Sequence, residues 1–194
     1  MSQKIRTFIA IDTPPAFKIQ MEEILTELEP AHLPVRWEKP YKLHLTVKFL
    51  GDIDSGLLDK VKLALDEIAL KHKPFWLRYS GFGFFPNPGN PRIIWVGCTP
   101  LSPDLNHLYN DIEDSCNKLG FEKEKREFHP HITIGRVKQR SGKNRRAVAD
   151  LTNRIENSTF DTIEDEAQSI LLMKSDLRPG GSEYSILKQF SLTS

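Results

Sequence analysis

The sequence predicts an α+β fold built from two similar halves, and three observations lead to this prediction. Strand and helix patterns follow one another in the order strand, helix, strand, helix, strand, and this order occurs twice. A four-residue motif, His44-Leu45-Thr46-Val47, returns as His131-Ile132-Thr133-Ile134 on the corresponding strand of the second half. Several strands alternate polar and apolar residues, as antiparallel strands with one buried face do. We therefore expect a bilobal, pseudo-two-fold duplication in which two antiparallel sheets face a central cleft, with helices outside.

The first half begins with an alternating segment, followed by prolines that favour the start of a helix. Apolar residues at helical spacing, from Phe17 to Leu28, then run up to Pro30. Asp54 and Ser55 are candidates for the cap of the second helix, and Gly51 is expected to stop the preceding strand. The segments expected are strand 6–11, helix 17–28, strand 35–37, strand 43–50, helix 57–69, strand 75–79 and strand 92–96. Between the last two strands, residues 81–91 have the composition of a turn with an aromatic cluster.

The second half repeats this order. Gly120 is placed to end its first helix in the left-handed conformation, and Pro179-Gly180-Gly181 is placed to join the last two strands. The segments expected are helix 101–119, strand 131–137, helix 147–157, strand 169–173 and strand 184–192. We interpret the acidic residues near the end of the chain as a solvated face rather than a metal site; they are Asp161, Glu164, Asp165 and Glu166.

Length and composition limit the class of protein. A chain of 194 residues with 39% hydrophobic residues is long enough for a single two-lobed domain over residues 1–194. No signal peptide and no run of eighteen apolar residues are visible, so we expect a cytoplasmic protein without membrane contact. Cys98 and Cys116 form no disulfide framework and no zinc spacing, and they are expected to be reduced core thiols. The absence of a coiled-coil pattern and of a spare apolar face favours a monomer.

The repeated motif places imidazole and hydroxyl side chains on rigid strands. Alternate side chains of a strand share a face, so His44 points the same way as Thr46, and His131 the same way as Thr133. The alternative is two histidines on solvated strand faces. Two copies on strands, each with apolar residues at the intervening positions, are however improbable as a coincidence.

These residue types suit displacement at phosphorus. Cleavage of a phosphodiester without a metal needs a base for the attacking oxygen and an acid for the leaving oxygen, and histidine can serve as either near neutral pH. Hydroxyls of Thr46 and Thr133 can donate hydrogen bonds to the phosphoryl oxygens. Arg136 adds a candidate charged donor at the rim of the cleft.

Other candidates carry less weight. His129 and His131 resemble a metal pair, but no third ligand is visible at a plausible spacing, so no metal or other cofactor is expected. Phe49, and Phe84 or Phe85, are candidates for stacking on a base, although alternation favours burial of Phe49. The basic segment 138–146 is either a solvated loop or a clamp for a nucleic-acid backbone, and its position directly after the second motif favours the clamp.

Nearly the whole chain resembles the RNA 2',3'-cyclic phosphodiesterases, also called the 2'-5' RNA ligase family, within the two-histidine phosphoesterase superfamily. The two His-x-Thr motifs, with Lys-Phe-Leu-Gly after the first and a proline before the second, are highly specific for this family. The matching segments are 6–11, Trp37, 44–51, 91–97, 128–136 and 184–190.

The resemblance implies a LigT-like bilobal fold and metal-independent hydrolysis of a terminal 2',3'-cyclic phosphate to a 2'-phosphate, with RNA ends or nucleoside 2',3'-cyclic phosphates as substrates. It further implies that His44 is the general acid for the departing 3' oxygen and that His131 is the base that activates water. Thr46, Thr133 and Arg136 would hold the phosphate. Two alternatives stay open: an RNA-end-binding module that has lost turnover, and reverse ligation through a 2'-5' bond by the same groups.

Overall fold

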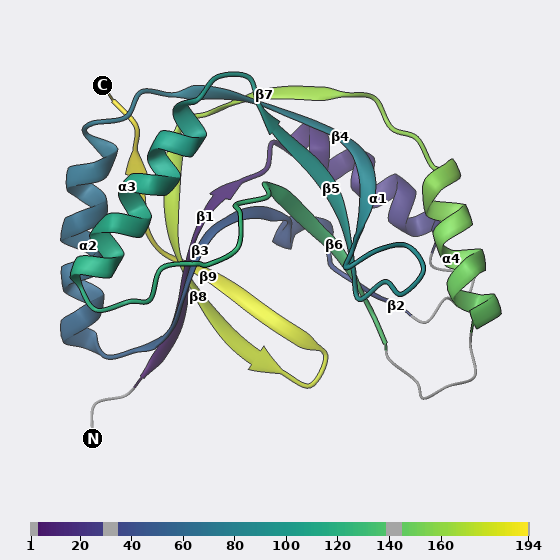
Figure 1. Cartoon of the computed structure of the whole chain (residues 1–194), viewed down its shortest axis with the longest axis horizontal. Helices are drawn as coiled ribbons and strands as arrows, with labels where there is room; N and C mark the ends of the chain where they lie inside the picture. Colours follow the sequence, from purple (N-terminus) through teal and green to yellow (C-terminus); the bar gives the residue numbers. More distant parts are fainter. Residues whose placement is uncertain (1–3, 29–34, 139–144, 194) are drawn as a thin grey trace.

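The protein contains one long, curled antiparallel sheet with helices packed at both of its ends (Figure 1). The structure is a computed structural model that describes residues 4–28, 35–138 and 145–193. Most of the basic segment 138–146 lies outside the described residues. The strands are β1 (Ile5–Asp12), β2 (Val35–Trp37), β3 (His44–Ile53), β4 (Phe75–Phe85), β5 (Ile93–Pro100), β6 (His131–Val137), β7 (Ile163–Ala167), β8 (Ser169–Arg178) and β9 (Gly181–Ser191). The helices are α1 (Pro15–Leu28), α2 (Ser55–Ala69), α3 (Asp104–Lys118) and α4 (Arg145–Asn157), with a 3₁₀ turn at Pro40–Lys42.

The strand order is symmetric about the centre of the sheet. It runs β7-β4-β5-β6-β3-β1-β8-β9, with β2 beside β6. The two central strands, β3 and β6, are joined by a single antiparallel pair, Leu45 with Ile132. The two expected sheets are therefore the two halves of one curled sheet, which meet at one pair of residues. This arrangement confirms the predicted α+β class and the duplicated order of elements.

Each half of the sequence contributes its closing strand to the half of the sheet that contains the motif strand of the other half of the sequence. β4, from the first half of the chain, pairs with β5 and β7. β8, from the second half, pairs with β1 and β9. Because of this exchange, each half of the sheet contains strands from both halves of the sequence.

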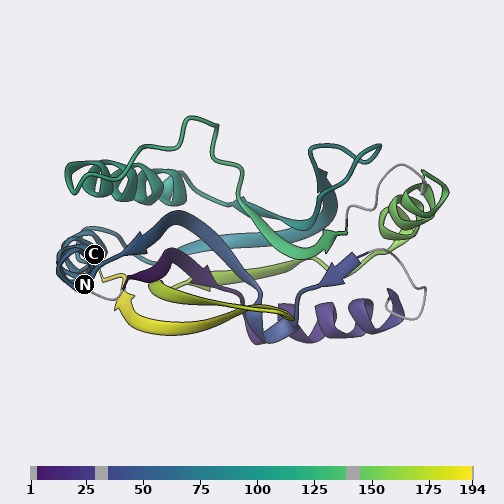
Figure 2. The same cartoon turned by 90° about the horizontal axis from the view of Figure 1, so that it is seen from below.

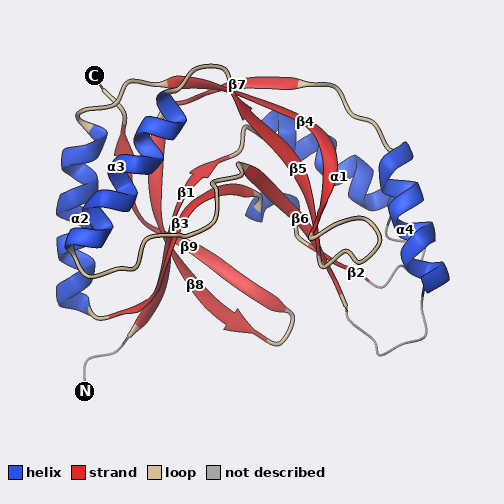
Figure 3. Cartoon of the chain, viewed as in Figure 1, coloured by secondary structure: helices blue, strands red, loops and turns tan. Residues whose placement is uncertain are grey.

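The helices lie at the two ends of the sheet, α2 and α3 at one end and α1 and α4 at the other (Figures 1, 2 and 3). Their apolar residues join the sheet in one large core cluster. A smaller cluster lies elsewhere and consists of Phe8, Ala10, Leu171 and Met173, with Tyr184 packed against it. The predicted cap of α2 is confirmed, because the carboxylate of Asp54 accepts a hydrogen bond of 2.9 Å from the backbone N–H of Leu57. Cys98 and Cys116 are buried free thiols, as expected.

β5 and β8 run past their predicted ends, to Pro100 and Arg178. β3 and β4 do so as well, and in each of these two a glycine lies close to the predicted end. Gly51, at φ +73°, does not end β3; it pairs with Thr7 at an irregularity in the register, and the strand continues to Ile53. Gly81, at φ +66°, occupies a register shift in β4, and the strand continues through the aromatic residues to Phe85. The predicted turn at 81–91 is therefore wrong for its first five residues. Both glycines accommodate bulges, which interrupt the pairing without ending it.

β7 was not predicted. Its sequence, Ile-Glu-Asp-Glu-Ala, is poor in strand-forming residues, and three of its five side chains are acidic. It forms because it can pair with the free edge of β4. Phe75 to Tyr79 of β4 pair with Ala167 to Ile163. Among the described residues, no helix has both the length and the apolar character needed to cross a membrane.

Candidate active site

The pairing of Leu45 with Ile132 brings the two His-x-Thr motifs together. Both of these residues are fully buried on the core side of the sheet. Their neighbours along each strand point to the opposite face, so His44 and Thr46 share that face with His131 and Thr133. In an antiparallel pair this places His44 beside Thr133, and His131 beside Thr46. The structure therefore unites the four residues singled out from the sequence.

Each histidine is held by a backbone carbonyl two residues before it. Nδ1 of His44 lies 2.6 Å from the carbonyl oxygen of Lys42, and Nδ1 of His131 lies 2.7 Å from that of His129. A carbonyl only accepts hydrogen bonds, so Nδ1 carries the proton in both rings. In the neutral form, Nε2 is then the unprotonated nitrogen, free to accept or return a proton.

Aromatic rings surround both histidines. Phe8 of β1 and Tyr184 of β9 lie 4.9 Å and 5.2 Å from His44, measured between ring centroids. Phe85 of β4 lies 4.9 Å from His131, with its ring perpendicular, and Trp95 of β5 lies 6.3 Å away. These walls remove both imidazoles from much of the solvent.

Burial lowers the pKa of His44 and of His131 below the ordinary value of 6.5, because it penalises the charged ring. The hydrogen bonds to the carbonyls oppose this effect, and the positive charge of Arg136 adds to it at both rings. The guanidinium of Arg136 thus influences the pKa of both histidines.

A β-bulge follows each His-x-Thr motif at the same position. In β3, Ile9 pairs with Lys48 and Ala10 with Thr46, so Val47 is the extra residue. In β6, Ile94 pairs with Gly135 and Trp95 with Thr133, so Ile134 is the extra residue. In each strand the two residues at the bulge are both buried. The alternation then resumes with the opposite parity.

The bulges turn Phe49 and Arg136 toward the face of the histidines. Each of these residues lies five positions after its histidine. The expectation that Phe49 is buried is wrong: its side chain is 71% exposed, and its ring lies 6.1 Å from that of Phe8. Simple alternation predicted burial because it did not include the extra residue in the strand.

Arg136 is held by a carboxylate from the segment after β2. Its Nε lies 3.4 Å from Oε1 of Glu38, and the side chain is 43% exposed. The preceding Gly135 gives room for Trp37, since a Cβ atom there would lie 2.7 Å from the indole ring. Packing of Trp37 against Gly135 therefore allows β2 to lie close to β6, beside Arg136.

Of the remaining candidates, Phe85 and His129 lie beside this site and Phe84 does not. Phe84 is buried in the core, whereas Phe85 is partly exposed and lies against His131. The ring of His129 lies 5.0 Å from Trp95 and 5.4 Å from Phe85, so it packs among aromatic rings. Within the described part of the chain, no three His, Cys, Asp or Glu residues are grouped as a metal site.

Sequence reasoning missed several contributors. The carbonyl groups of Lys42 and His129 have no side-chain signal, although each lies two residues before a histidine. Tyr184 and Trp95 reach the histidines from strands that are distant in the sequence, and Glu38, which lies shortly before the first motif, contacts Arg136 on the strand of the second. Only the sheet order shows that they are neighbours.

Comparison with known proteins identifies the family of the chain. The family described as LigT-like phosphoesterase matches residues 11–95 and again residues 96–184, one match for each half. The chain is 37% identical over 187 residues to the RNA 2',3'-cyclic phosphodiesterase of Methanocaldococcus jannaschii, covering 96% of this chain and all of the relative. It is 33% identical over 186 residues to the protein of the same name from Archaeoglobus fulgidus, covering 96% of this chain and 99% of the relative.

Solved structures share the fold. The crystal structure of TT0787 from Thermus thermophilus superimposes with a TM-score of 0.78 at 25% identity, covering 97% of this chain and 98% of the other. E. coli LigT in complex with 3'-AMP gives a TM-score of 0.74 at 22% identity, covering 99% and 100%. With both halves matched by the family and the full length matched by its relatives, the chain belongs to the LigT-like phosphoesterase family.

Proposed function

We propose that this protein is an RNA 2',3'-cyclic phosphodiesterase that hydrolyses the cyclic phosphate at an RNA 3' end to a 2'-phosphomonoester. The observation that carries the proposal is the Leu45–Ile132 pair, which sets two histidines and two threonines on one face of a rigid sheet. The names of the relatives, whose matches cover 96% of the chain, supply the substrate class.

In the proposed reaction, a water oxygen attacks phosphorus while Nε2 of His131 takes one of its protons. The bond between phosphorus and the 3' oxygen breaks, and Nε2 of His44 gives a proton to that oxygen. The products are a 2'-phosphate and a free 3' hydroxyl. The two histidines thus supply both proton transfers of the reaction, one from the attacking water and one to the leaving 3' oxygen.

Negative charge on the phosphoryl oxygens needs donors that are already in place. The hydroxyls of Thr46 and Thr133 and the guanidinium of Arg136 are proposed to supply them. Phe49, exposed beside Phe8, is proposed to offer its ring to a base of the RNA. The proposed mechanism needs no metal, because protein side chains supply the acid, the base and the charge stabilisation.

The decisive experiment uses an oligonucleotide that ends in a 2',3'-cyclic phosphate, incubated with the protein and an excess of chelator. We expect a 2'-phosphate product, and a large loss of rate in His44→Ala and His131→Ala. Formation of a 3'-phosphate would show that the other oxygen leaves. Binding without any product would instead support the alternative, an RNA-end-binding module.

Ligation through a 2'-5' bond would use the same groups in the same roles, and cleavage of that bond to regenerate the cyclic phosphate would be its microscopic reverse. A 5' hydroxyl of a second RNA would replace water, and His131 would take its proton. The test is to add an excess of RNA with a 5' hydroxyl to the cyclic-phosphate substrate and to search for a joined product that resists nucleases specific for 3'-5' linkages.

A further inference from the structure

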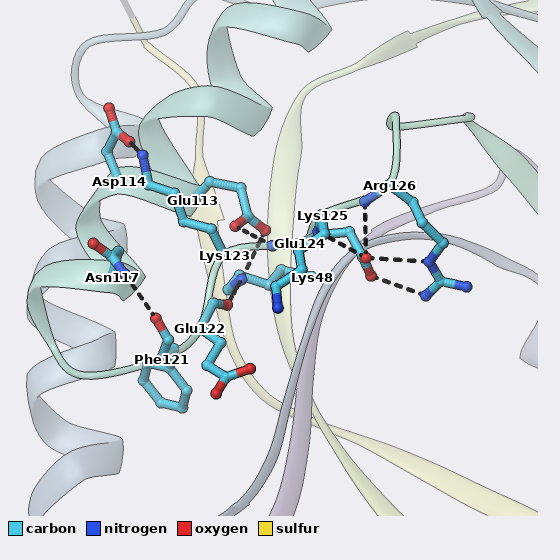
Figure 4. Close-up of polar contacts among 10 residues, drawn as sticks. All are labelled: Lys48, Glu113, Asp114, Asn117, Phe121, Glu122, Lys123, Glu124, Lys125 and Arg126. Carbon is cyan, nitrogen blue, oxygen red and sulfur yellow. Dashed lines mark hydrogen bonds and ion pairs between the residues drawn. The ribbon is translucent and has the colours of Figure 1, made fainter.

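Lys48 belongs to the first motif strand, yet its side chain is buried on the core side of the sheet (Figure 4). Ordinary alternation would place it on the face of the histidines, between Val47 and Phe49. The bulge at Val47 turns it inward instead. Its ammonium forms an ion pair of 2.7 Å with Glu113 of α3, and the two side chains are only 4% and 7% exposed.

This ion pair holds the backbone of a different segment. Nζ of Lys48 also donates to the carbonyl oxygen of Glu122 at 3.0 Å, and Oε2 of Glu113 accepts from the backbone N–H of Glu124 at 3.1 Å. Both contacts lie in the segment 119–130, which joins α3 to β6 without regular secondary structure. The buried pair thus satisfies backbone groups on either side of Lys123.

The same segment is attached to α3 by two further side chains on one helical face. The ring of Tyr109 stacks on that of Phe128 at 4.1 Å between centroids, with the planes 5° apart. The amide of Asn117 donates to the carbonyl oxygen of Phe121 at 3.1 Å. Residues 109, 113 and 117 are four positions apart, so they line one face of the helix. Phe128 directly precedes His129, whose carbonyl holds His131.

Stability alone is a weak reason for such a pair. Taking two charges out of water is costly, and apolar replacements of similar size are often as stable. The hydrogen bonds to Glu122 and Glu124 give it a more specific role. A carbonyl that fixes the tautomer of a reacting histidine must itself be fixed, since small displacements of reacting groups lower rates steeply.

We infer that Lys48 and Glu113 are positioning residues, which couple the strand of the first motif to the segment that presents the carbonyl of His129 to His131. In this arrangement the first motif strand sets the orientation of the histidine on the second. The inference rests on the proposed function for its effect on rate, whereas its effect on the His131 ring is independent of any activity.

The test compares Glu113→Gln and the double variant Lys48→Met/Glu113→Met with the wild-type protein. The double variant replaces the whole pair with apolar side chains of similar length, so no charge is left unpaired in the core. The ¹⁵N signals of the His131 and His44 rings report which nitrogen carries the proton, and kcat and KM are measured on the cyclic-phosphate substrate. Urea unfolding confirms that each variant is folded.

We expect the His131 signals of the double variant to show a mixture of tautomers, while those of His44 are unchanged. We expect kcat to fall about tenfold or more, with a smaller change in KM. Glu113→Gln should change the His131 signals in the same direction by a smaller amount. If the double variant does not fold, Glu113→Gln decides alone. Wild-type His131 signals in the folded variant would overturn the inference, whatever the rate.

Lys123→Met is the matched control. Lys123 lies in the same segment and pairs with Asp114 of the same helix, but both side chains are more than half exposed. We expect wild-type ring signals and a wild-type kcat. Equal changes in Lys123→Met and in the double variant would overturn the inference, since any contact with α3 would then be sufficient. A wild-type protein without hydrolytic activity would instead count against the proposed function, and the ring signals would still test the positioning.

Discussion

The two strands that carry the motifs have a β-bulge at the same position, but different side chains follow the bulge in each strand. β3 and β6 each present His-x-Thr, followed by a bulge that buries two consecutive residues. After the bulge, β3 continues with Lys48 and Phe49, and β6 with Gly135 and Arg136. The inward residue is the buried cation Lys48 in β3, whereas in β6 it is Gly135, which leaves room for Trp37. The outward residue is Phe49 in β3 and Arg136 in β6. A symmetric pair of histidines is thereby set in asymmetric surroundings, which suits the proposed reaction, in which the attacking and leaving groups differ.

The largest expected difference between the strands is the role of each histidine. We expect His44→Ala and His131→Ala each to reduce kcat/KM by about 10²–10⁴ on the natural cyclic phosphate. A substrate with sulfur in place of the 3' bridging oxygen has a leaving group that needs no proton. On this substrate His44→Ala should recover most of the rate, whereas His131→Ala should not. If the His131 variant recovers its rate instead, His131 is the general acid and His44 is the base.

The second comparison concerns Arg136 and Phe49, the equivalent residues beyond the bulges. Arg136→Ala removes a charged donor and should lower kcat/KM about tenfold to a hundredfold, with a weaker dependence of binding on salt. Phe49→Ala removes a stacking ring and should raise KM for an oligonucleotide by about tenfold, with little change in kcat. Steady-state kinetics at two salt concentrations separate the two effects. Equal effects on kcat would show that the two positions do not differ in function.

The pH profile tests whether both imidazoles act. At low pH the proposed base is protonated and cannot accept a proton; at high pH the proposed acid is neutral and cannot give one, so a bell shape is expected. Burial lowers the pKa of both rings, so the alkaline limb of kcat/KM should fall below the ordinary value of 6.5. Arg136→Ala removes a positive charge near both rings and should move both limbs to higher pH. A flat profile between pH 5 and 8, with chemistry rate-limiting, would contradict paired histidine catalysis.

The smallest expected effects are on stability, at a glycine beyond each motif. Gly135→Ala places a methyl group against Trp37 and should reduce the free energy of unfolding by about 1–3 kcal/mol. Gly51→Ala meets no atom within 4 Å but keeps a left-handed backbone, which should cost about 1–2 kcal/mol. Urea unfolding gives both values. Only Gly135→Ala should also lower activity, because it displaces the neighbour of Arg136; loss of activity in both would indicate that the strands respond alike.

Much of the site could be predicted from the sequence because His-x-Thr is a local pattern. Alternation along a strand places His44 beside Thr46, and the repeat at His131 marks the partner. The helices were predicted for the same reason, since apolar spacing and capping residues such as Asp54 act within one turn. The duplicated order predicted that the two motifs face one another across a cleft, but not that their strands pair directly through Leu45 and Ile132.

The missed features depend on pairing between distant strands. A bulge is visible only when two strands are laid side by side, so the exposure of Phe49 and the burial of Lys48 escaped simple alternation. β7 exists because β4 has a free edge, although its own residues are poor strand formers. The strand at 81–85 continues because Gly83 leaves room for the indole of Trp95 on β5. In each case tertiary contacts outweigh the local preference.

The exchange of closing strands has a consequence for how the protein forms during synthesis. β1 pairs on one side with β8, more than 150 residues later in the chain. Until β8 is made, an edge of β1 has no partner and is a site for misplaced pairing. Contacts of such long range slow folding, so we expect the nascent chain to depend on chaperones until β8 and β9 emerge.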